Sequence, residues 1–97
     1  MQPLGNTRSD RKVSTSVGTA VRLVSTNTPC RRVTIQALPT NTNWIAIGDS
    51  SVLCTAGSEK GTFLSAGSSV TMYIEDLYQI YLDVLTSGEG VTYVYEF

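Results

Sequence analysis

The sequence contains no histidine, and this absence excludes whole classes of chemistry. Serine and cysteine hydrolases that need an imidazole base are excluded, and so are zinc sites with histidine ligands. The two cysteines, Cys30 and Cys54, are too few for a four-thiolate zinc or iron–sulfur centre. We therefore predict that the chain is not an enzyme and that it has no catalytic residues, no metal and no cofactor.

Charged residues are also scarce, at 15% of 97 residues, with seven basic and eight acidic side chains. A soluble domain usually has about 25%. So few basic side chains do not provide the broad positive surface that nucleic acids require, and we predict no direct nucleic-acid binding. No apolar run is long enough to cross a membrane, and the first residues lack the apolar segment of a secretory signal. We expect synthesis in a cytosol and no contact with a membrane.

Serine and threonine, by contrast, are abundant and together supply 24 residues. Threonine and the many valines are branched at Cβ, which favours β-strands. Residues 74–85 also fit a helical period, but their branched and tyrosine side chains favour strands with a tight turn near Asp76. From residue 13 onward, segments that alternate apolar and polar residues are separated by turns rich in Gly, Pro and Asn. We predict strands within 13–17, 19–25, 31–37, 44–48, 51–56, 62–64, 70–74, 80–84 and 91–97.

About eight short strands at this spacing are typical of an all-β protein with two packed sheets. We predict a single small antiparallel β-sandwich over residues 13–97. Its strand order is either jelly-roll or immunoglobulin-like, and strand count alone does not decide between them. Residues 1–12 lack apolar periodicity and carry Arg8, Arg11 and Lys12, so we interpret them as a flexible, extended N-terminal arm. Deleting this arm should leave the fold intact and weaken assembly.

Three other patterns have simple structural interpretations. Gly48, Asp49 and Ser50 match a block found in some esterases, but without a base they form a turn after a strand. The acids Asp49, Asp76, Asp83 and Glu89 fall in separate segments, which favours solvated turn residues over a calcium site. A Cys30–Cys54 disulfide would staple two strand ends, but cytosolic synthesis favours two free thiols that can be replaced as a pair.

A series of motifs runs through most of the chain: PCRRVTIQA at 29–37, IAIGDSSV at 45–52, LSAGSSVT at 64–71, IYLD at 80–83 and GEGVTYVY at 88–95. Over residues 19–97 this order resembles small β-sandwich structural proteins of tailed-bacteriophage virions, the kind that decorates or cements capsids. The resemblance implies a non-enzymatic virion protein, assembled in the host cytoplasm. Its partners would be the major capsid protein or other virion proteins. Because homotrimers at lattice three-folds are common among such proteins, we expect a homotrimer, or a monomer that trimerises on the capsid.

The alternation also predicts which aromatic side chains point away from the core. Trp44, Tyr73 and Tyr81 each neighbour inward-facing residues and are expected to face outward. Trp and Tyr are enriched at interface centres, so we predict partner contacts at these three residues and at Arg8, Arg11 and Lys12 of the arm. Coverage of both sheet faces by loops of the same subunit is the competing interpretation.

A second function fits the same residues. The chain would then be a receptor- or carbohydrate-binding module of a phage tail or fibre. Trp44 would provide an aromatic platform, with Asn41, Asn43 and Asp49 as polar partners.

Overall fold

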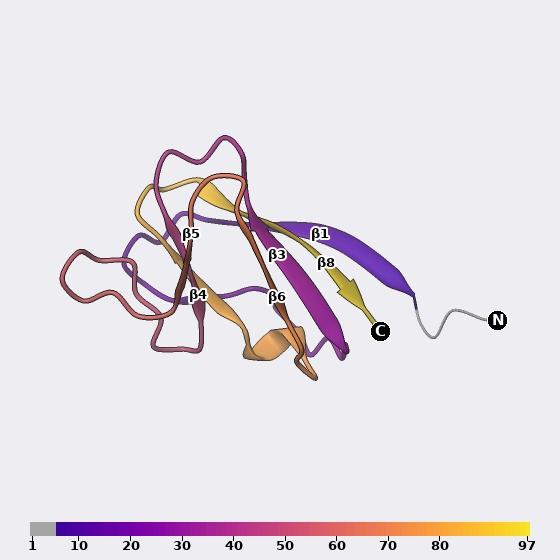
Figure 1. Ribbon diagram of the computed structural model, residues 1–97. Coiled ribbons are helices and arrows are strands. Elements are labelled where there is room, and N and C mark those ends of the chain that lie inside the picture. Colours follow the sequence, from indigo (N-terminus) through magenta and orange to yellow (C-terminus); the bar gives the residue numbers. More distant parts are fainter. Residues whose placement is uncertain (1–5) are drawn as a thin grey trace.

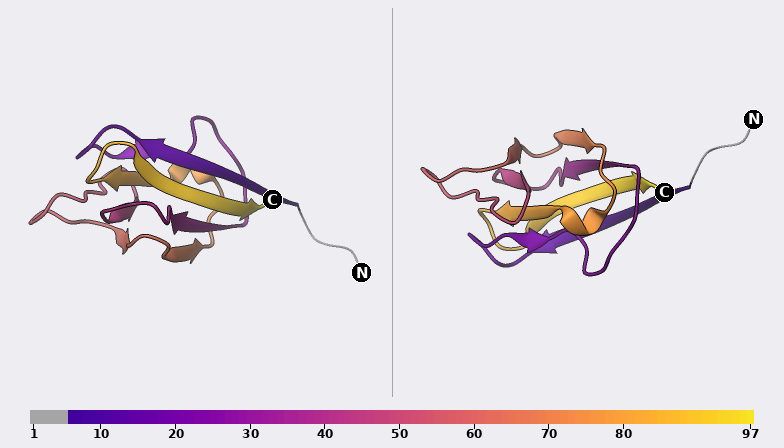
Figure 2. Two further views of the ribbon diagram at one scale, coloured as in Figure 1. Left: turned by 90° about the horizontal axis from the view of Figure 1, so that it is seen from above. Right: turned by 90° about the horizontal axis from the view of Figure 1, so that it is seen from below.

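Two antiparallel sheets face each other in the computed structural model, which describes residues 6–97 (Figures 1 and 2). Sheet A has the strand order β1-β8-β3-β6, and sheet B has the order β2-β7-β4-β5. One short 3-10 helix, η1, precedes β7. The elements are β1 (Thr7–Ser14), β2 (Val21–Arg22), β3 (Arg32–Ala37), β4 (Ile45–Gly48), β5 (Thr62–Leu64), β6 (Ser69–Met72), η1 (Leu77–Gln79), β7 (Tyr81–Val84) and β8 (Glu89–Glu96).

The strand pairing identifies a jelly roll. Strand β1 pairs with β8, β2 with β7, β3 with β6 and β4 with β5, all antiparallel. These four pairs form one long folded ribbon, and the β3–β8 and β4–β7 pairs join its parts into two sheets. An eight-stranded double sheet of this kind is a jelly roll and not an immunoglobulin fold. The predicted all-β sandwich is confirmed.

The main core lies between the two sheets and follows the predicted alternation. Val33, Ile35 and Ala37 of β3 are fully buried, whereas the alternating residues Arg32 and Gln36 are exposed. The remaining buried apolar side chains of this core are Leu23, Ile45, Ile47, Leu64, Leu77, Ile80, Leu82, Val84, Val91, Tyr93 and Tyr95. Period-two patterning therefore located most of the core correctly.

Asp76 explains the turn expected before β7. Its Oδ1 accepts hydrogen bonds from the Thr28 amide (2.7 Å) and the Tyr78 amide (2.9 Å), and its Oδ2 accepts one from the Asn27 side chain (2.8 Å). The bonds from Asn27, Tyr78 and Thr28 hold the pKa of Asp76 below its usual value. The carboxylate thus caps η1 and ties it to the segment between β2 and β3.

The expected N-terminal arm is wrong for residues 7–12, which belong to strand β1. Thr7 to Ser14 pair residue by residue with Glu96 to Glu89, although Thr7–Arg11 are exposed. An edge strand is held by main-chain hydrogen bonds, so it needs no apolar alternation. Deleting residues 1–12 would remove most of β1, and an untouched fold is no longer expected. Residues 1–5 of the expected arm lie outside the described residues.

Three predicted strands are shorter than expected. The strand expected at 13–17 is only the end of β1, and that expected at 19–25 is reduced to β2. Within 51–56 only Leu53 forms a bridge, to Lys60. In these segments side-chain contacts with the outer face of sheet B replace regular strand pairing.

Gly90 allows β1 to lie close beside β8 where Val13 is its partner. A Cβ at this position would collide with the carbonyl oxygen of Lys12 and would lie 2.7 Å from the Cα of Val13. Both groups are backbone, so relief would require the two strands to separate.

We predict that Gly90→Ala lowers the free energy of unfolding by about 2 kcal/mol, the usual scale for overpacking. Gly48→Ala is the matched control, because a Cβ at Gly48 meets only Val52 and Gly61 at ordinary contact distances of 3.5 Å and 3.6 Å. Urea unfolding of both variants provides the measurement. Equal losses of unfolding free energy in the two variants would show that the close approach of β1 to β8 does not require glycine at position 90.

Candidate functional site

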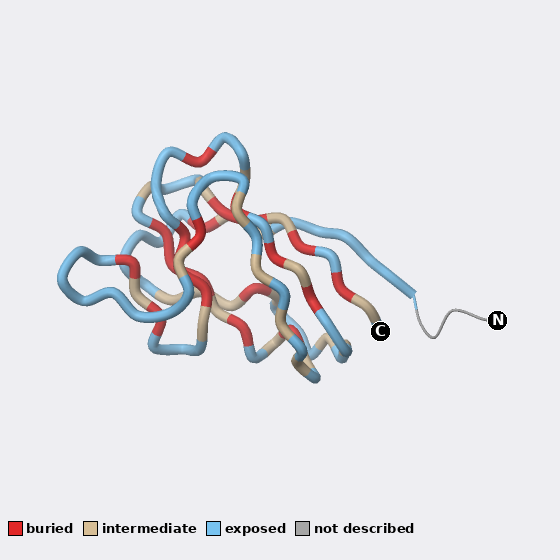
Figure 3. Tube along the Cα trace, viewed as in Figure 1, coloured by how far each residue is buried: buried red, intermediate tan, exposed pale blue. Residues whose placement is uncertain are grey.

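The outer face of sheet B carries a second apolar cluster. In antiparallel sheets paired residues point to the same face, and Ala46 of β4 pairs with both Phe63 of β5 and Asp83 of β7. Ala46 is buried on this face together with Val52 and Cys54 of the loop at residues 49–61, the β4–β5 loop. This loop is exposed along most of its length and buried at those two positions (Figure 3). The loop therefore folds back over the sheet.

The carboxylate of Asp83 fixes the loops that cover sheet B. Asp83 is fully buried, and its Oδ2 accepts a hydrogen bond from the Cys54 amide at 2.7 Å. Its Oδ1 accepts from the amides of Gly18 at 3.0 Å and Val84 at 2.9 Å. One carboxylate thus binds both the β4–β5 loop and the segment between β1 and β2. The expectation that Asp83 is a solvated turn residue is wrong, because these loops cover the outward side of β7.

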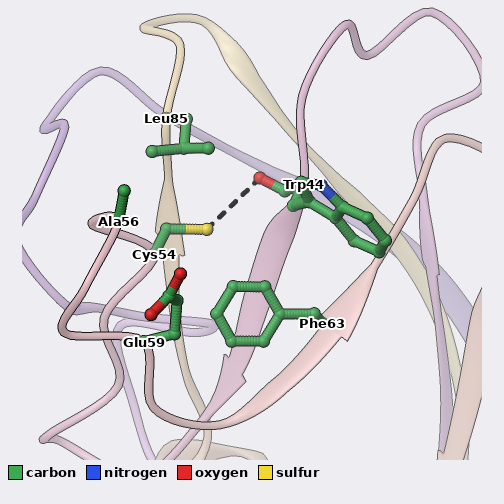
Figure 4. A pocket seen from close by; sticks show the side chains of 6 residues that line it. All are labelled: Trp44, Cys54, Ala56, Glu59, Phe63 and Leu85. Atoms are coloured by element: carbon green, nitrogen blue, oxygen red, sulfur yellow. Dashed lines mark hydrogen bonds between the residues drawn. The ribbon is translucent and has the colours of Figure 1, made fainter.

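Beside this anchored region lies an open hollow of about 490 Å³ (Figure 4). We call it the Trp44 hollow. It is lined by Trp44, Cys54, Ala56, Glu59, Phe63 and Leu85. The Trp44 side chain is 51% exposed, and its ring meets that of Phe63 edge-on, with centroids 6.3 Å apart. Cys54 Sγ lies 3.3 Å from the Trp44 carbonyl oxygen, which connects the β4–β5 loop to the start of β4. The hollow is mainly apolar, with the Glu59 carboxylate as its one charged group.

Phe63 and Leu85 are site residues that the sequence interpretation missed. Each follows the parity rule that placed Trp44 outward. Phe63 precedes the buried Leu64, and Leu85 follows the buried Val84. Alternation could therefore have assigned both to an outer face, but not to the same place, because β5 and β7 are joined only through β4.

A second hollow, of about 380 Å³, also has Trp44 in its lining, together with several polar residues. It includes Asn41, Thr42 and Asn43, whose polar groups bond within the chain. Asn41 exchanges hydrogen bonds with the Gly90 backbone at 2.9 Å and 3.4 Å, and Glu89 accepts from the Thr42 amide and hydroxyl and from the Asn43 amide. Loss of hydration acts to raise the pKa of Glu89, but these bonds outweigh it and the pKa lies below its usual value.

The structure brings together part of the set proposed for sugar binding. Asn41 and Asn43 are engaged as described, the latter also donating to the Thr86 hydroxyl at 2.6 Å. Asp49 lies beyond the opposite end of β4 from Trp44, where it accepts hydrogen bonds from the amide and hydroxyl of Ser51. Trp44, Asn41 and Asn43 of that set line the second hollow together, and Asp49 does not.

The three aromatic residues expected to face outward occupy different places. Tyr73 is 79% exposed and follows β6 at the edge of sheet A, away from the Trp44 hollow. Tyr81 is on the outer face of sheet B but is half-buried. The Arg22 guanidinium carbon lies 4.8 Å from the Tyr81 ring centroid and 3.7 Å from that of Tyr78. Loops and Arg22 cover the sheet at Tyr81 and leave it open at Trp44.

The three basic residues of the expected arm lie in β1 instead. Arg8 stacks over the ring of Phe97, with its guanidinium carbon 5.5 Å from the centroid. Arg8 and Arg11 are exposed, and Lys12 is half-buried. The structure therefore does not bring the six predicted contact residues into one surface.

Both cysteines are free thiols, as predicted, and they belong to different apolar clusters. Burial raises the pKa of Cys30, whose Sγ lies 3.1 Å from the Ile74 carbonyl oxygen. Burial, with a contribution from Asp83, raises the pKa of Cys54 to about 11. A thiol that stays protonated at neutral pH is a weak nucleophile, so Cys54 acts as an apolar packing group.

Protein-family models, curated proteins and solved structures yield no match to the chain. Residues 6–97 contain no group of three or more His, Cys, Asp or Glu side chains that could hold a metal ion. In the same part of the chain no helix is long and apolar enough to span a membrane. The Trp44 hollow is the feature from which a functional proposal starts.

We predict that Asp83→Asn lowers the free energy of unfolding by about 2 kcal/mol or more, because buried loop amides lose charged hydrogen-bond acceptors. Glu75→Gln, which also removes one negative charge but from an exposed side chain, should have little effect. Chemical unfolding of the two variants gives the comparison. A neutral result for Asp83→Asn would contradict the anchoring role of this carboxylate.

The thiol pKa values predict a pH profile for alkylation. In the Cys30→Ser variant only Cys54 remains, and its modification by iodoacetamide in the folded protein should stay slow at pH 8 and rise as the pH approaches about 11. In urea, where the chain is unfolded, the alkylation rate of Cys54 should rise near pH 9.0, the usual pKa of a cysteine thiol. Between these values the folded state holds a proton that the unfolded state has lost, so stability falls as pH rises. Coincident folded and unfolded profiles would contradict the burial of Cys54.

Proposed function

We propose that this protein is a non-enzymatic structural protein of a bacteriophage virion, a capsid decoration or cement protein. It binds the major capsid protein or other virion proteins and stabilises the head lattice. Two lines of support are the order of its motifs and its jelly-roll topology, an architecture common in viral capsid and lectin domains. Fold alone does not define function, so the proposal depends on the surface the fold presents.

The Trp44 hollow is the observation that carries this proposal. Trp44, Phe63 and Leu85 form an exposed apolar depression on a charge-poor chain. Such depressions accept apolar side chains of a partner, and tryptophan is among the residues that dominate binding energy at interface centres. The floor at Cys54 is held in place by Asp83, so the site exists before binding and little ordering entropy is lost.

The non-enzymatic part of the proposal has its own support. The chain has no histidine, and the pKa values of both thiols are raised by burial. The one carboxylate at the Trp44 hollow, that of Glu59, accepts a hydrogen bond from the Gly57 amide at 3.1 Å. Cys54 and Glu59 both line the hollow, but the raised pKa of the thiol and the hydrogen bond already made by the carboxylate weigh against their acting as nucleophile and base.

We predict that Trp44→Ala weakens binding to undecorated capsids of the encoding phage about thirtyfold, which corresponds to about 2 kcal/mol at an interface centre. Its melting temperature should change little, because the ring is half exposed. Ala56→Arg is a second test, since a large charged side chain would fill the hollow from an exposed position. Co-sedimentation with capsids measures binding, and thermal unfolding measures the fold.

Tyr73→Ala is the matched control, because it removes an exposed aromatic ring from the other sheet. We expect its capsid binding to remain within about threefold of that of the unmodified protein, the range for a rim residue. Normal capsid binding by both Trp44→Ala and Ala56→Arg would refute the proposal. So would failure of the unmodified protein to bind capsids.

A receptor- or carbohydrate-binding module is the second candidate. The half-exposed Trp44 ring, which lines both hollows, is the observation that favours it. The internal bonding of Asn41, Asn43 and Glu89 weighs against it, because few polar groups remain to orient a sugar. Binding to immobilised glycans that is lost in Trp44→Ala, without capsid binding, would favour this candidate.

A further inference from the structure

Strand β1 ends sheet A with an unpaired edge in the described part of the chain. The strand order places β8 on one side of β1 and no strand on the other. Residues Thr7–Arg11 are exposed, and burial increases only from Lys12 to Ser14. A long strand with one free edge is a template for pairing with another strand.

The hydrogen-bond phase of this edge follows from its pairing with β8. Asn6 and Phe97 exchange both main-chain hydrogen bonds at 3.0 Å. Because such pairs alternate along an antiparallel ladder, the even-numbered residues of β1 bond to β8. The amides and carbonyls of Thr7, Ser9, Arg11 and Val13 therefore point to the free edge.

We propose that β1 pairs with β1 of a second copy of this chain, antiparallel and about a two-fold axis at Ser9. Ser9 then pairs with Ser9 of the second copy. Thr7 of each copy pairs with Arg11 of the other. All of these pairs form hydrogen bonds through the main-chain groups at the free edge. This register places Arg8 opposite Asp10 of the second copy, and Asp10 opposite Arg8. These are non-hydrogen-bonded pairs, in which the side chains approach most closely. The contact does not depend on the virion function proposed above.

Charge selects this register among those that the free edge allows. A two-fold axis at Asp10 would place Asp10 against Asp10 and Arg8 against Lys12, which is repulsive throughout. An axis at Arg11 would pair Asp10 with Lys12 but oppose Arg11 to Arg11, and it would draw on the half-buried part of the strand. The axis at Ser9 has no like-charge pair and lies within the exposed part.

Charged side chains often protect an edge from pairing, and Asp10 shows how this edge is covered in a single copy. Its Oδ1 accepts a hydrogen bond from the Arg11 amide at 2.8 Å, one of the free-edge donors. In the pair, that amide donates to the Thr7 carbonyl of the second copy, and the Asp10 carboxylate turns to Arg8. In the dimer two such local bonds, one in each copy, are exchanged for main-chain bonds and two ion pairs.

Sedimentation of the full chain over a concentration range tests the pairing. The unmodified protein should show a monomer–dimer equilibrium that weakens as salt is added. Arg8→Glu and Asp10→Lys should each weaken the dimer about tenfold, because each converts two attractive pairs into repulsive ones. The double variant Arg8→Glu/Asp10→Lys should restore the affinity to within about threefold, since the pairs are reversed but still opposite in charge.

Two further variants separate this contact from others and from unfolding. Ser9→Pro removes a free-edge amide at the two-fold axis without removing a bond to β8, so it should abolish the dimer and keep the melting temperature. Lys12→Glu should leave the affinity unchanged, whereas the axis at Arg11 predicts a loss. A monomer at all concentrations, a trimer, or a double variant that is not restored would overturn the proposal. Capsid binding by a strictly monomeric protein would leave the function proposed above intact.

Discussion

The hydrogen bonds of the Asp83 carboxylate hold the outer layer of sheet B together. A polar group buried in a protein is tolerated where its oxygens are satisfied, and the side-chain oxygens of Asp83 accept hydrogen bonds from three main-chain amides. Two of those amides belong to loops that have little regular structure of their own. The carboxylate therefore substitutes for strand pairing: it converts loose connections into a fixed layer over sheet B. The shape of the Trp44 hollow depends on that layer, because Cys54 donates its amide hydrogen bond to Asp83 and also lines the hollow.

Local sequence patterns gave the sandwich and much of its core, because alternation reports directly which side of a strand is buried. The rows Val33, Ile35 and Ala37 and Val91, Tyr93 and Tyr95 are buried as the pattern predicts. Strand order depends on pairing between segments far apart in the chain, and no local pattern encodes it. Strand β1 was missed for a related reason: its residues are solvent-exposed, so nothing in their polarity distinguishes a paired edge strand from a free arm.

The same limit applies to the site. Parity correctly placed Trp44 and Tyr81 on an outer face, but it did not show that Tyr81 is half-buried there. The scatter of the acids along the chain likewise did not show that Asp83 is fully buried. The alternation tells only to which face of its sheet a side chain points. Whether loops form a second layer over that face depends on how the loops fold. Here the β4–β5 loop and the segment around Gly18 cover Asp83 and part of Tyr81 and stop short of Trp44. The boundary of that coverage defines the hollow, and it becomes visible only in three dimensions.

The pairing of the first strand with the last has a consequence for how the chain acquires its structure. Thr7 lies opposite Glu96, and β8 is an inner strand of sheet A between β1 and β3. Sheet A therefore cannot form while the ribosome still holds the residues of β8. Contacts of such long sequence separation also slow folding, since a large loop must close before they form. Sheet A is therefore expected to be completed late, and until β8 is in place the apolar rows that it covers stay exposed to aggregation.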